Sequence, residues 1–337
     1  MQFPILFKEM SSPIILSRTP FRLSLGGGST DMKTYYEHHG GFIFAVAIDM
    51  YMDLLIKQTR SDDLIHVHYK SFESVLDVNQ VQHVLAREAL KMTGHTKGIA
   101  ISFKADTPAG TGLGSSGACL VALLKGLSFY SGEEMTREEA AEKSFEITQA
   151  LGLPDGKQDP YACALGGFVV LDIDKSGKVH ISKPKFSSQT INKFLNNTLL
   201  FYTGVSRESH PLLSAQDSEK VLALKHETKR IGKAIYEAFL KDDLDTFGML
   251  MDEHWQIKKG MSREMTNQQF DDIYNTAKSA GALGGKIIGA GGGGYFLFYV
   301  PGEKAKQSVR EAIGAFNLRE MAFAIDELGS RTQKVDF

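Results

Sequence analysis

The stretch PAGTGLGSSGA, residues 108–118, has the composition of a loop that binds an anion. Its flanks, IAISFKA and CLVALLKGL, are apolar, as expected for a strand and a helix rather than for a flexible linker. Closely spaced glycines let backbone N–H groups approach a ligand, and a helix N-terminus adds positive potential. The stretch therefore predicts a phosphate-binding loop, with Ser115 and Ser116 at the N-cap position of the helix.

The two common nucleotide-binding motifs do not describe this loop. Counting from Gly110, the G-x-G-x-x-G pattern requires a third glycine at position 115, where the chain has Ser115. No stretch of the chain matches G-x-x-x-x-G-K-[ST]. The loop is therefore a different solution to phosphate binding, in which the Ser116 hydroxyl could also contact a phosphate-bound Mg²⁺.

A second glycine loop, RTPFRLSLGGGSTD, covers residues 18–31. Taken alone, it is most simply a tight turn capped by Asp31. Arg22, however, lies within the expected strand, and a buried arginine requires a partner. Asp31, which follows the glycines, could accept hydrogen bonds from sugar hydroxyls.

Two further stretches carry candidate site residues. Residues 289–300, GAGGGGYFLFYV, predict a strand–turn–strand unit whose backbone packs closely against the first two loops or against a ligand. In GKQDPYACALGG, Pro160 favours an extended backbone at Asp159. An Asp in this apolar stretch suggests a reactive carboxylate, and a cap for a helix at 160–165 is a serious alternative.

The length of 337 residues suits two closely joined domains, which we place at 1–185 and 186–337. Strands and helices alternate irregularly, so the predicted class is α+β. Two long helices should occupy 218–260, with a break near Asp242 and Asp243. The other expected strands span 13–25, 42–57, 64–69, 98–106, 166–174, 199–205 and a segment near 321–326, and the other expected helices span 31–38, 81–93, 133–152, 267–280 and 303–316.

The composition excludes several functional classes. With 38 basic and 40 acidic residues, the net charge of −2 provides no general attraction to nucleic acid or to an anionic membrane surface. No apolar run reaches membrane-spanning length, and the N-terminus lacks the pattern of a secretory signal, so we expect a cytoplasmic protein. Cys119 and Cys163 lie in apolar stretches and are expected to be buried, reduced thiols.

Together, the three glycine loops and Asp159 resemble the GHMP small-molecule kinases, and most of all their heptose 7-phosphate kinase branch. PAGTGLGSSGA resembles the ATP phosphate loop, RTPFRLSLGGGSTD the first motif in its sugar-1-kinase form, and KIIGAGGGGYF the third motif. GKQDPYACALGG and LFYTGVSRES resemble stretches of the heptose and fucose kinases. The resemblance implies a two-domain GHMP kinase fold, with an N-terminal ribosomal-S5-like domain and a C-terminal ferredoxin-like α/β domain.

The resemblance also implies roles for individual residues. Asp159 corresponds to the catalytic aspartate and Arg22 to the catalytic cation, while Ser116 and Glu146 fall where the family holds Mg²⁺. For Glu146, a surface charge on a helix is the alternative. The expected ATP-binding residues are Pro108, Gly110, Thr111, Gly112, Leu113, Gly114, Ser115, Ser116 and Gly117, and the expected substrate-binding residues are Gly27, Gly28, Thr30, Asp31, Gly292 and, for a second phosphate, Arg207 or Lys104.

Two positions depart from the family pattern. The phosphate loop reads SSGA where many members have SSAA, and Pro160 follows Asp159 where glutamine is common. Neither change removes a reactive group, although the first could alter the start of the helix and the second should stiffen the Asp159 backbone.

The implied activity is ATP- and Mg²⁺-dependent phosphorylation of the anomeric hydroxyl of a heptose 7-phosphate. The product would be the 1,7-bisphosphate, used in nucleotide-activated heptose synthesis. The alternatives are fucokinase or another sugar-1-kinase, or a non-catalytic sugar and ATP sensor. The expected partner is a small-molecule substrate, with no nucleic acid or membrane, and the protein is expected to be a monomer or a homodimer.

Overall fold

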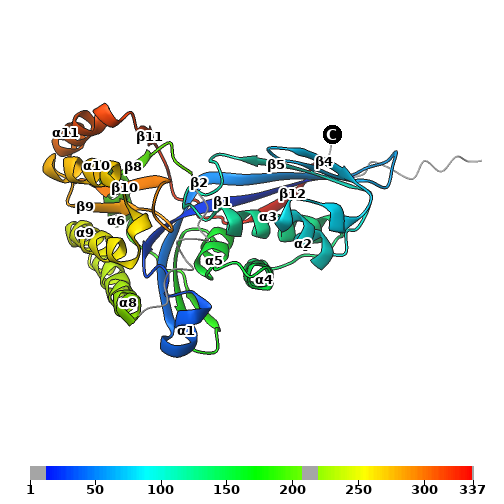
Figure 1. Cartoon of the computed structure of the whole chain (residues 1–337), viewed down its shortest axis with the longest axis horizontal. Coiled ribbons are helices and arrows are strands. Elements are labelled where there is room, and N and C mark those ends of the chain that lie inside the picture. The colour runs from blue at the N-terminus through cyan, green and yellow to red at the C-terminus, as the bar shows by residue number, and fades with distance from the viewer. Residues whose placement is uncertain (1–12, 207–218, 336–337) are drawn as a thin grey trace, which may run out of the picture.

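Two long neighbouring strands organise the N-terminal half of the computed structural model, which describes residues 13–206 and 219–335 (Figure 1). Strand β1 (Ile14–Gly26) pairs antiparallel with β2 (Gly41–Gln58), and the register shifts between Pro20 and Phe21. The order of this sheet is β12-β1-β2-β5-β3-β4, and β6 and β7 extend it from the first half of β2. The other strands are β3 (Ile65–His68), β4 (Phe72–Val75), β5 (Ile99–Ala105), β6 (Phe168–Ile173), β7 (Val179–Ser182) and β12 (Arg331–Val335).

Helices cover one face of this sheet (Figure 1). The central one, α3 (Ser115–Tyr130), is apolar on nearly every side and is buried between β1, β2 and the neighbouring helices. Helix α4 (Arg137–Ala150) begins with a capping box formed by Thr136 and Glu139. The remaining N-terminal helices are α1 (Lys33–His39), α2 (Val84–Met92) and α5 (Gln158–Leu165).

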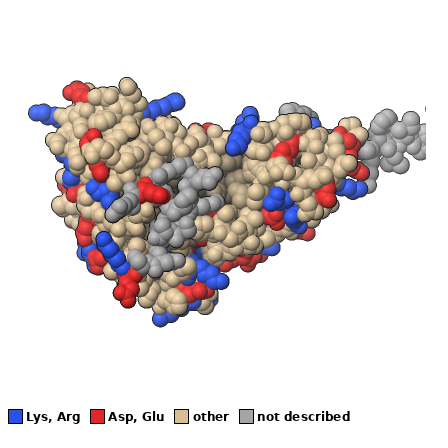
Figure 2. Space-filling view, in the orientation of Figure 1, with Lys and Arg blue, Asp and Glu red and all other residues tan. Residues whose placement is uncertain are grey.

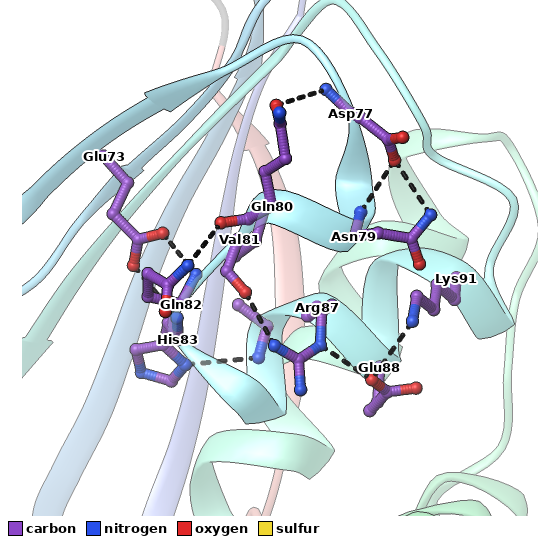
Figure 3. A network of polar contacts seen from close by, with 11 residues as sticks. Glu73, Asp77, Asn79, Gln80, Val81, Gln82, His83, Arg87, Glu88 and Lys91 are labelled. Atoms are coloured by element: carbon purple, nitrogen blue, oxygen red, sulfur yellow. Dashed lines mark hydrogen bonds and ion pairs between the residues drawn. The ribbon is translucent and has the colours of Figure 1, made fainter.

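A polar network fixes the chain between β4 and α2 (Figure 3). The Glu73 carboxylate accepts hydrogen bonds from the backbone N–H groups of Gln82 at 2.5 Å and His83 at 2.9 Å. The His83 ring in turn accepts from the Ala86 N–H at the start of α2. This short helix therefore has a defined first turn, although it begins three residues later than the predicted position 81.

The C-terminal half contains a four-stranded sheet with the order β11-β8-β10-β9 and its own helices (Figure 1). Helices α8 (Glu219–Leu240) and α9 (Leu244–Met261) pack on each other. The predicted break between them is confirmed: Asp242 has a positive φ of 55°, and Asp243 caps α9. The other elements are α6 (Ser188–Asn197), β8 (Thr198–Tyr202), α10 (Gln268–Ser279), β9 (Gly284–Ile287), β10 (Tyr295–Tyr299), α11 (Glu303–Ile313) and β11 (Arg319–Met321).

The end of the chain returns to the first sheet. Strand β12 pairs with β1, and Ile325 forms an isolated bridge with Ile48. The prediction of a strand near 321–326 is therefore wrong. Strand β11 ends at Met321, and within 322–326 the chain forms only the single bridge of Ile325. The predicted domain boundary at residue 185 lies between β7 and α6 and stays a prediction. Strand β12, which comes after this boundary in the sequence, belongs to the N-terminal sheet.

The predicted α+β class with two domains is confirmed by the two sheets and their helices. Acidic and basic side chains are interspersed over the face seen in Figure 2, in keeping with the small net charge. Both cysteines are buried and unbridged. In the described part of the chain, no helix is both long and apolar enough to cross a membrane.

Candidate active site

Arg22 and Asp159 form the central ion pair of the site. Arg22 lies on β1 with a side chain only 2% exposed, whereas the Asp159 side chain is 35% exposed. The guanidinium donates to Asp159 Oδ1 from Nη2 at 2.6 Å and from Nε at 3.1 Å, and Nη1 donates to the Gly112 carbonyl at 2.5 Å. Since Arg22 engages Oδ1, Oδ2 is available to accept a hydrogen bond from a ligand. The partner that a buried Arg22 requires is therefore Asp159.

The backbone predicted for Asp159 is wrong. Asp159 lies in the first turn of α5, which begins at Gln158. The helix tolerates Pro160 because the first N–H groups of a helix have no intrahelical acceptor, so a missing N–H costs nothing there. The helix N-terminus also favours a negative charge, which stabilises the carboxylate at this position.

The phosphate loop lies directly beside this pair. The N-cap prediction is wrong: Gly114, with a φ of 81°, is the N-cap, and Ser115 and Ser116 are the first two helical residues. The Arg22 N–H donates to the Leu113 carbonyl at 3.0 Å, which ties the loop to β1. Both serines lie in the N-terminal turn of α3, where they border the hollow between the glycine loops.

The third glycine loop packs backbone to backbone against the phosphate loop, as predicted. A Cβ at Gly112 would lie 2.2 Å from the Ile288 carbonyl oxygen, and a Cβ at Gly289 would lie 2.3 Å from the Gly112 Cα. Both glycines also have a positive φ, so a side chain would be strained as well as crowded. This contact brings the C-terminal sheet to the site.

We call the hollow between these loops the central cavity. Its volume is about 550 Å³. Of the residues predicted from the sequence, those that line it are Arg22, Gly28, Asp31, Gly110, Gly112, Gly114, Ser115, Ser116 and Asp159.

Several predicted residues do not line the central cavity. The Thr30 hydroxyl is buried between the carbonyls of Gly27 and Phe42, and the Gly292 N–H donates to the Met265 carbonyl at 2.9 Å. Arg207 lies outside the described residues. The others that do not line the cavity are Gly27, Lys104, Pro108, Thr111, Leu113, Gly117 and Glu146, of which Glu146 is exposed on α4 and Lys104 is exposed on β5.

Asp31 is a buried acid on the cavity wall. Its Oδ2 accepts the Gln158 N–H at 2.8 Å, so it is fixed to the helix that carries Asp159. The pKa of Asp31 is raised to about 6, mainly by burial and also by the charge of Asp159, against the lowering effect of the Gln158 hydrogen bond. A Cβ at Gly156 would lie 2.1 Å from Oδ2, so the chain also needs glycine beside this carboxylate.

We expect the Asp31→Asn variant to be more stable than the wild type at a pH above about 6. Because the folded-state pKa is raised, wild-type stability falls as the pH rises from about 4 to about 6. At 1.36 kcal/mol per pKa unit, this is a difference of about 3 kcal/mol in unfolding free energy at pH 8. Denaturant unfolding at pH 4 and pH 8 tests this, with the exposed, capping Asp77→Asn as control. An equal effect of D31N at both pH values would contradict it.

Several residues of the central cavity were not predicted from the sequence. Gln158 accepts a hydrogen bond from Ser24 at 2.6 Å, so both fix the start of α5. On the C-terminal side, His254, Lys258 and Lys286 are buried and line the central cavity. A signal for two of them existed, since His254 and Lys258 share the helix face of Met251, Trp255 and Met261, which is otherwise apolar.

This arrangement of an arginine–aspartate pair, two serines at a helix start and closely packed glycine loops suits the transfer of a phosphoryl group. Residues 78–167 match the GHMP kinases N terminal domain, and residues 235–318 match the GHMP kinases C terminal domain. The chain therefore belongs to the GHMP kinase family and is an ATP-dependent kinase.

Individual proteins similar to the chain include kinases of heptose phosphates and of fucose. The chain is 26% identical to D-glycero-alpha-D-manno-heptose 7-phosphate kinase of Campylobacter jejuni, over 85% of this chain and 89% of the relative. It is 24% identical to the bifunctional fucokinase/GDP-fucose pyrophosphorylase of Arabidopsis thaliana, over 86% of this chain and 30% of that protein. The crystal structure of a D-glycero-D-manno-heptose 1-phosphate kinase from Bacteroides thetaiotaomicron superposes with a TM-score of 0.79 at 25% identity, covering 96% of this chain and all of that one.

Proposed function

We propose that this sugar kinase transfers the γ-phosphoryl group of ATP to the anomeric hydroxyl of a heptose 7-phosphate. The product is the 1,7-bisphosphate, an intermediate for nucleotide-activated heptose. The observation that carries the reaction type is the Arg22–Asp159 pair beside the phosphate loop. The choice of sugar rests on the similarity to the Campylobacter jejuni relative.

In the proposed mechanism, the N–H groups of the phosphate loop and the start of α3 bind the phosphates of ATP. Asp159 Oδ2 orients the acceptor hydroxyl and takes its proton as the oxygen bonds to the γ-phosphorus, while the bond from that phosphorus to the bridging oxygen breaks and ADP leaves. Arg22 holds the carboxylate in place and offsets the charge on the transferred group. Because the transition state is loose, position and electrostatics contribute more than the basicity of Asp159.

We propose Mg²⁺ as the counter-ion of the phosphates. Mg²⁺ in kinases is held by one or two protein oxygens together with substrate phosphates, and it offsets their charge. Ser116 fits this role, because it borders the central cavity and its hydroxyl has no hydrogen-bond partner among the described residues. Glu146 fits less well as the second ligand, because it is exposed on α4 and does not line the central cavity.

Fucokinase activity is the second candidate, since two curated fucokinases also match the chain. A sensor without turnover is disfavoured, because Arg22, Ser116 and Asp159 all retain their reactive groups at the central cavity.

The test is an ATP-consumption screen with D-glycero-D-manno-heptose 7-phosphate, L-fucose and free hexoses, with ³¹P NMR of the product. We expect turnover of the heptose 7-phosphate and a new anomeric phosphate signal. Turnover of fucose with an inert heptose 7-phosphate would reject the substrate and keep the kinase. Absence of turnover on every sugar, with retained nucleotide binding, would favour the sensor.

A further inference from the structure

Three buried basic side chains form a cluster on the C-terminal side of the central cavity. Lys258 and His254 come from α9, and Lys286 comes from β9. Lys258 is 8% exposed, His254 is 3% exposed and Lys286 is 2% exposed. All three line the central cavity. We call them the basic cluster. Arg22 and Asp159 line the same cavity.

The hydrogen bonds of the basic cluster leave donors unused. Lys258 Nζ donates to the carbonyls of Ile287, at 2.9 Å, and Gly289. Lys286 Nζ donates to the Leu25 carbonyl at 3.0 Å and lies 3.1 Å from His254 Nδ1. An ammonium group has three N–H donors. Each lysine in its protonated form therefore retains one donor for a ligand.

The charges of the basic cluster are not balanced by the protein. Among residues 13–206 and 219–335, no carboxylate lies within 4.0 Å of Lys258 or Lys286, whereas Arg22 has Asp159. Burial, and then the charge of Arg22, lowers the pKa of Lys258 to about 7. Burying ammonium groups without counter-charges destabilises a fold, and such an arrangement is typical of a site whose ligand supplies the charge.

On the basis of the proposed function, we infer that the basic cluster binds the phosphate that the sugar substrate already carries, through Lys258 and Lys286. Lys104, one of the two residues considered for this role from the sequence, is exposed on β5 and does not line the central cavity.

The position of the basic cluster favours the substrate phosphate over the phosphates of ATP. The ATP phosphates have their own donors in the phosphate loop and at the start of α3, and the transferred group must lie by Arg22 and Asp159. Lys258 and Lys286 instead come from α9 and β9 in the C-terminal half of the chain, and neither belongs to the phosphate loop or to the start of α3. We expect a sugar whose anomeric hydroxyl contacts Asp159 to place the phosphate at its far end on the basic cluster, which lines the same cavity.

The test compares Lys258→Met with Lys259→Met in the full-length kinase. Lys259 is the adjacent lysine on α9, with a side chain 25% exposed that pairs with Asp271, and it does not line the central cavity. The readout is the ratio of kcat/KM for heptose 7-phosphate to kcat/KM for the same heptose without the phosphate. A hydrogen bond to a charged group contributes about 1.5–3 kcal/mol, so we expect K258M to lower this ratio by roughly 10- to 100-fold. K259M should leave it within about twofold.

Lys286→Met is a second variant in case K258M folds poorly, and it should lower the same ratio. Inorganic phosphate provides an independent probe: it should compete with the sugar phosphate in the wild type and at least about tenfold more weakly in K258M. If heptose 7-phosphate is a good substrate and both variants keep the wild-type ratio, the basic cluster does not bind this phosphate. A rise in the KM for ATP alone would assign the lysines to the nucleotide and also overturn the inference.

If the wild-type enzyme prefers an unphosphorylated sugar, the proposed substrate fails. Competition by inorganic phosphate that depends on Lys258 would then still support an anion site at the basic cluster. Absence of that competition would reject the site as well. The two proposals can therefore fail separately.

Discussion

The Asp159→Asn variant is expected to lose about three orders of magnitude in kcat while its affinity for ATP is unchanged. A positioned general base contributes about 10²- to 10⁴-fold, and Asp159 is the only acid in direct contact with Arg22 among the described residues. The amide has nearly the same shape as the carboxylate, but it cannot take the acceptor proton. The measurements are kcat with both substrates saturating and the Kd of ATP by calorimetric titration.

The chain offers a matched control for this variant, in a pair whose arginine lies on the same strand as Arg22. Arg18 and Asp53 form an equivalent arginine–aspartate pair, with an Nη2–Oδ2 distance of 2.7 Å and side chains 47% and 38% exposed. Asp53→Asn removes a pair of the same chemistry at the surface, where such pairs contribute little to stability. We expect full kcat for D53N.

The stability of the D159N protein distinguishes catalysis from folding. Removing one partner of a pair leaves the buried Arg22 without its counter-charge, which destabilises the fold. We therefore expect a lower melting temperature together with unchanged ATP binding at 25 °C. Near-wild-type kcat in D159N would remove Asp159 from the chemistry, whatever its effect on melting.

Local signals predicted much of this architecture. The three glycine loops lie where the sequence places them because their flanking apolar runs can only be buried elements. The break between α8 and α9 was predictable because Asp243 supplies its cap within the same few residues. In each of these cases the information lies within one stretch of the chain.

The errors occurred where two local rules compete or where partners are distant in sequence. At Asp159, the bias imposed on the residue before a proline competes with the tolerance of proline in a first helical turn, and the helix is formed. At Ser115, the cap was supplied instead by Gly114 in a left-handed conformation. The burial of Lys286 depends on Leu25, 261 residues away, and so no local pattern reveals it.

The departure at Gly117 from the common family pattern acquires a physical explanation in the structure. The first turns of α3 and α5 touch at this glycine: a Cβ would lie 2.6 Å from the Pro160 nitrogen and 2.9 Å from the Asp159 Cβ. The two unusual residues of the chain, Gly117 and Pro160, are therefore in contact. With this close packing, an alanine at position 117 would push the start of α5 and its carboxylate away from α3.

We expect Gly117→Ala to lower kcat by about 100-fold, since a displacement of about 1 Å at a reacting group can cost that much. In an unobstructed helix the same change would stabilise the protein by about 0.5–1 kcal/mol, so any loss in melting temperature measures the clash. Gly314→Ala is the control, because a Cβ there meets no atom within 4 Å and φ is −56°. It should keep full activity. A G117A enzyme with wild-type kcat would show that α5 can shift without displacing Asp159, and that the contact with Pro160 does not position the carboxylate.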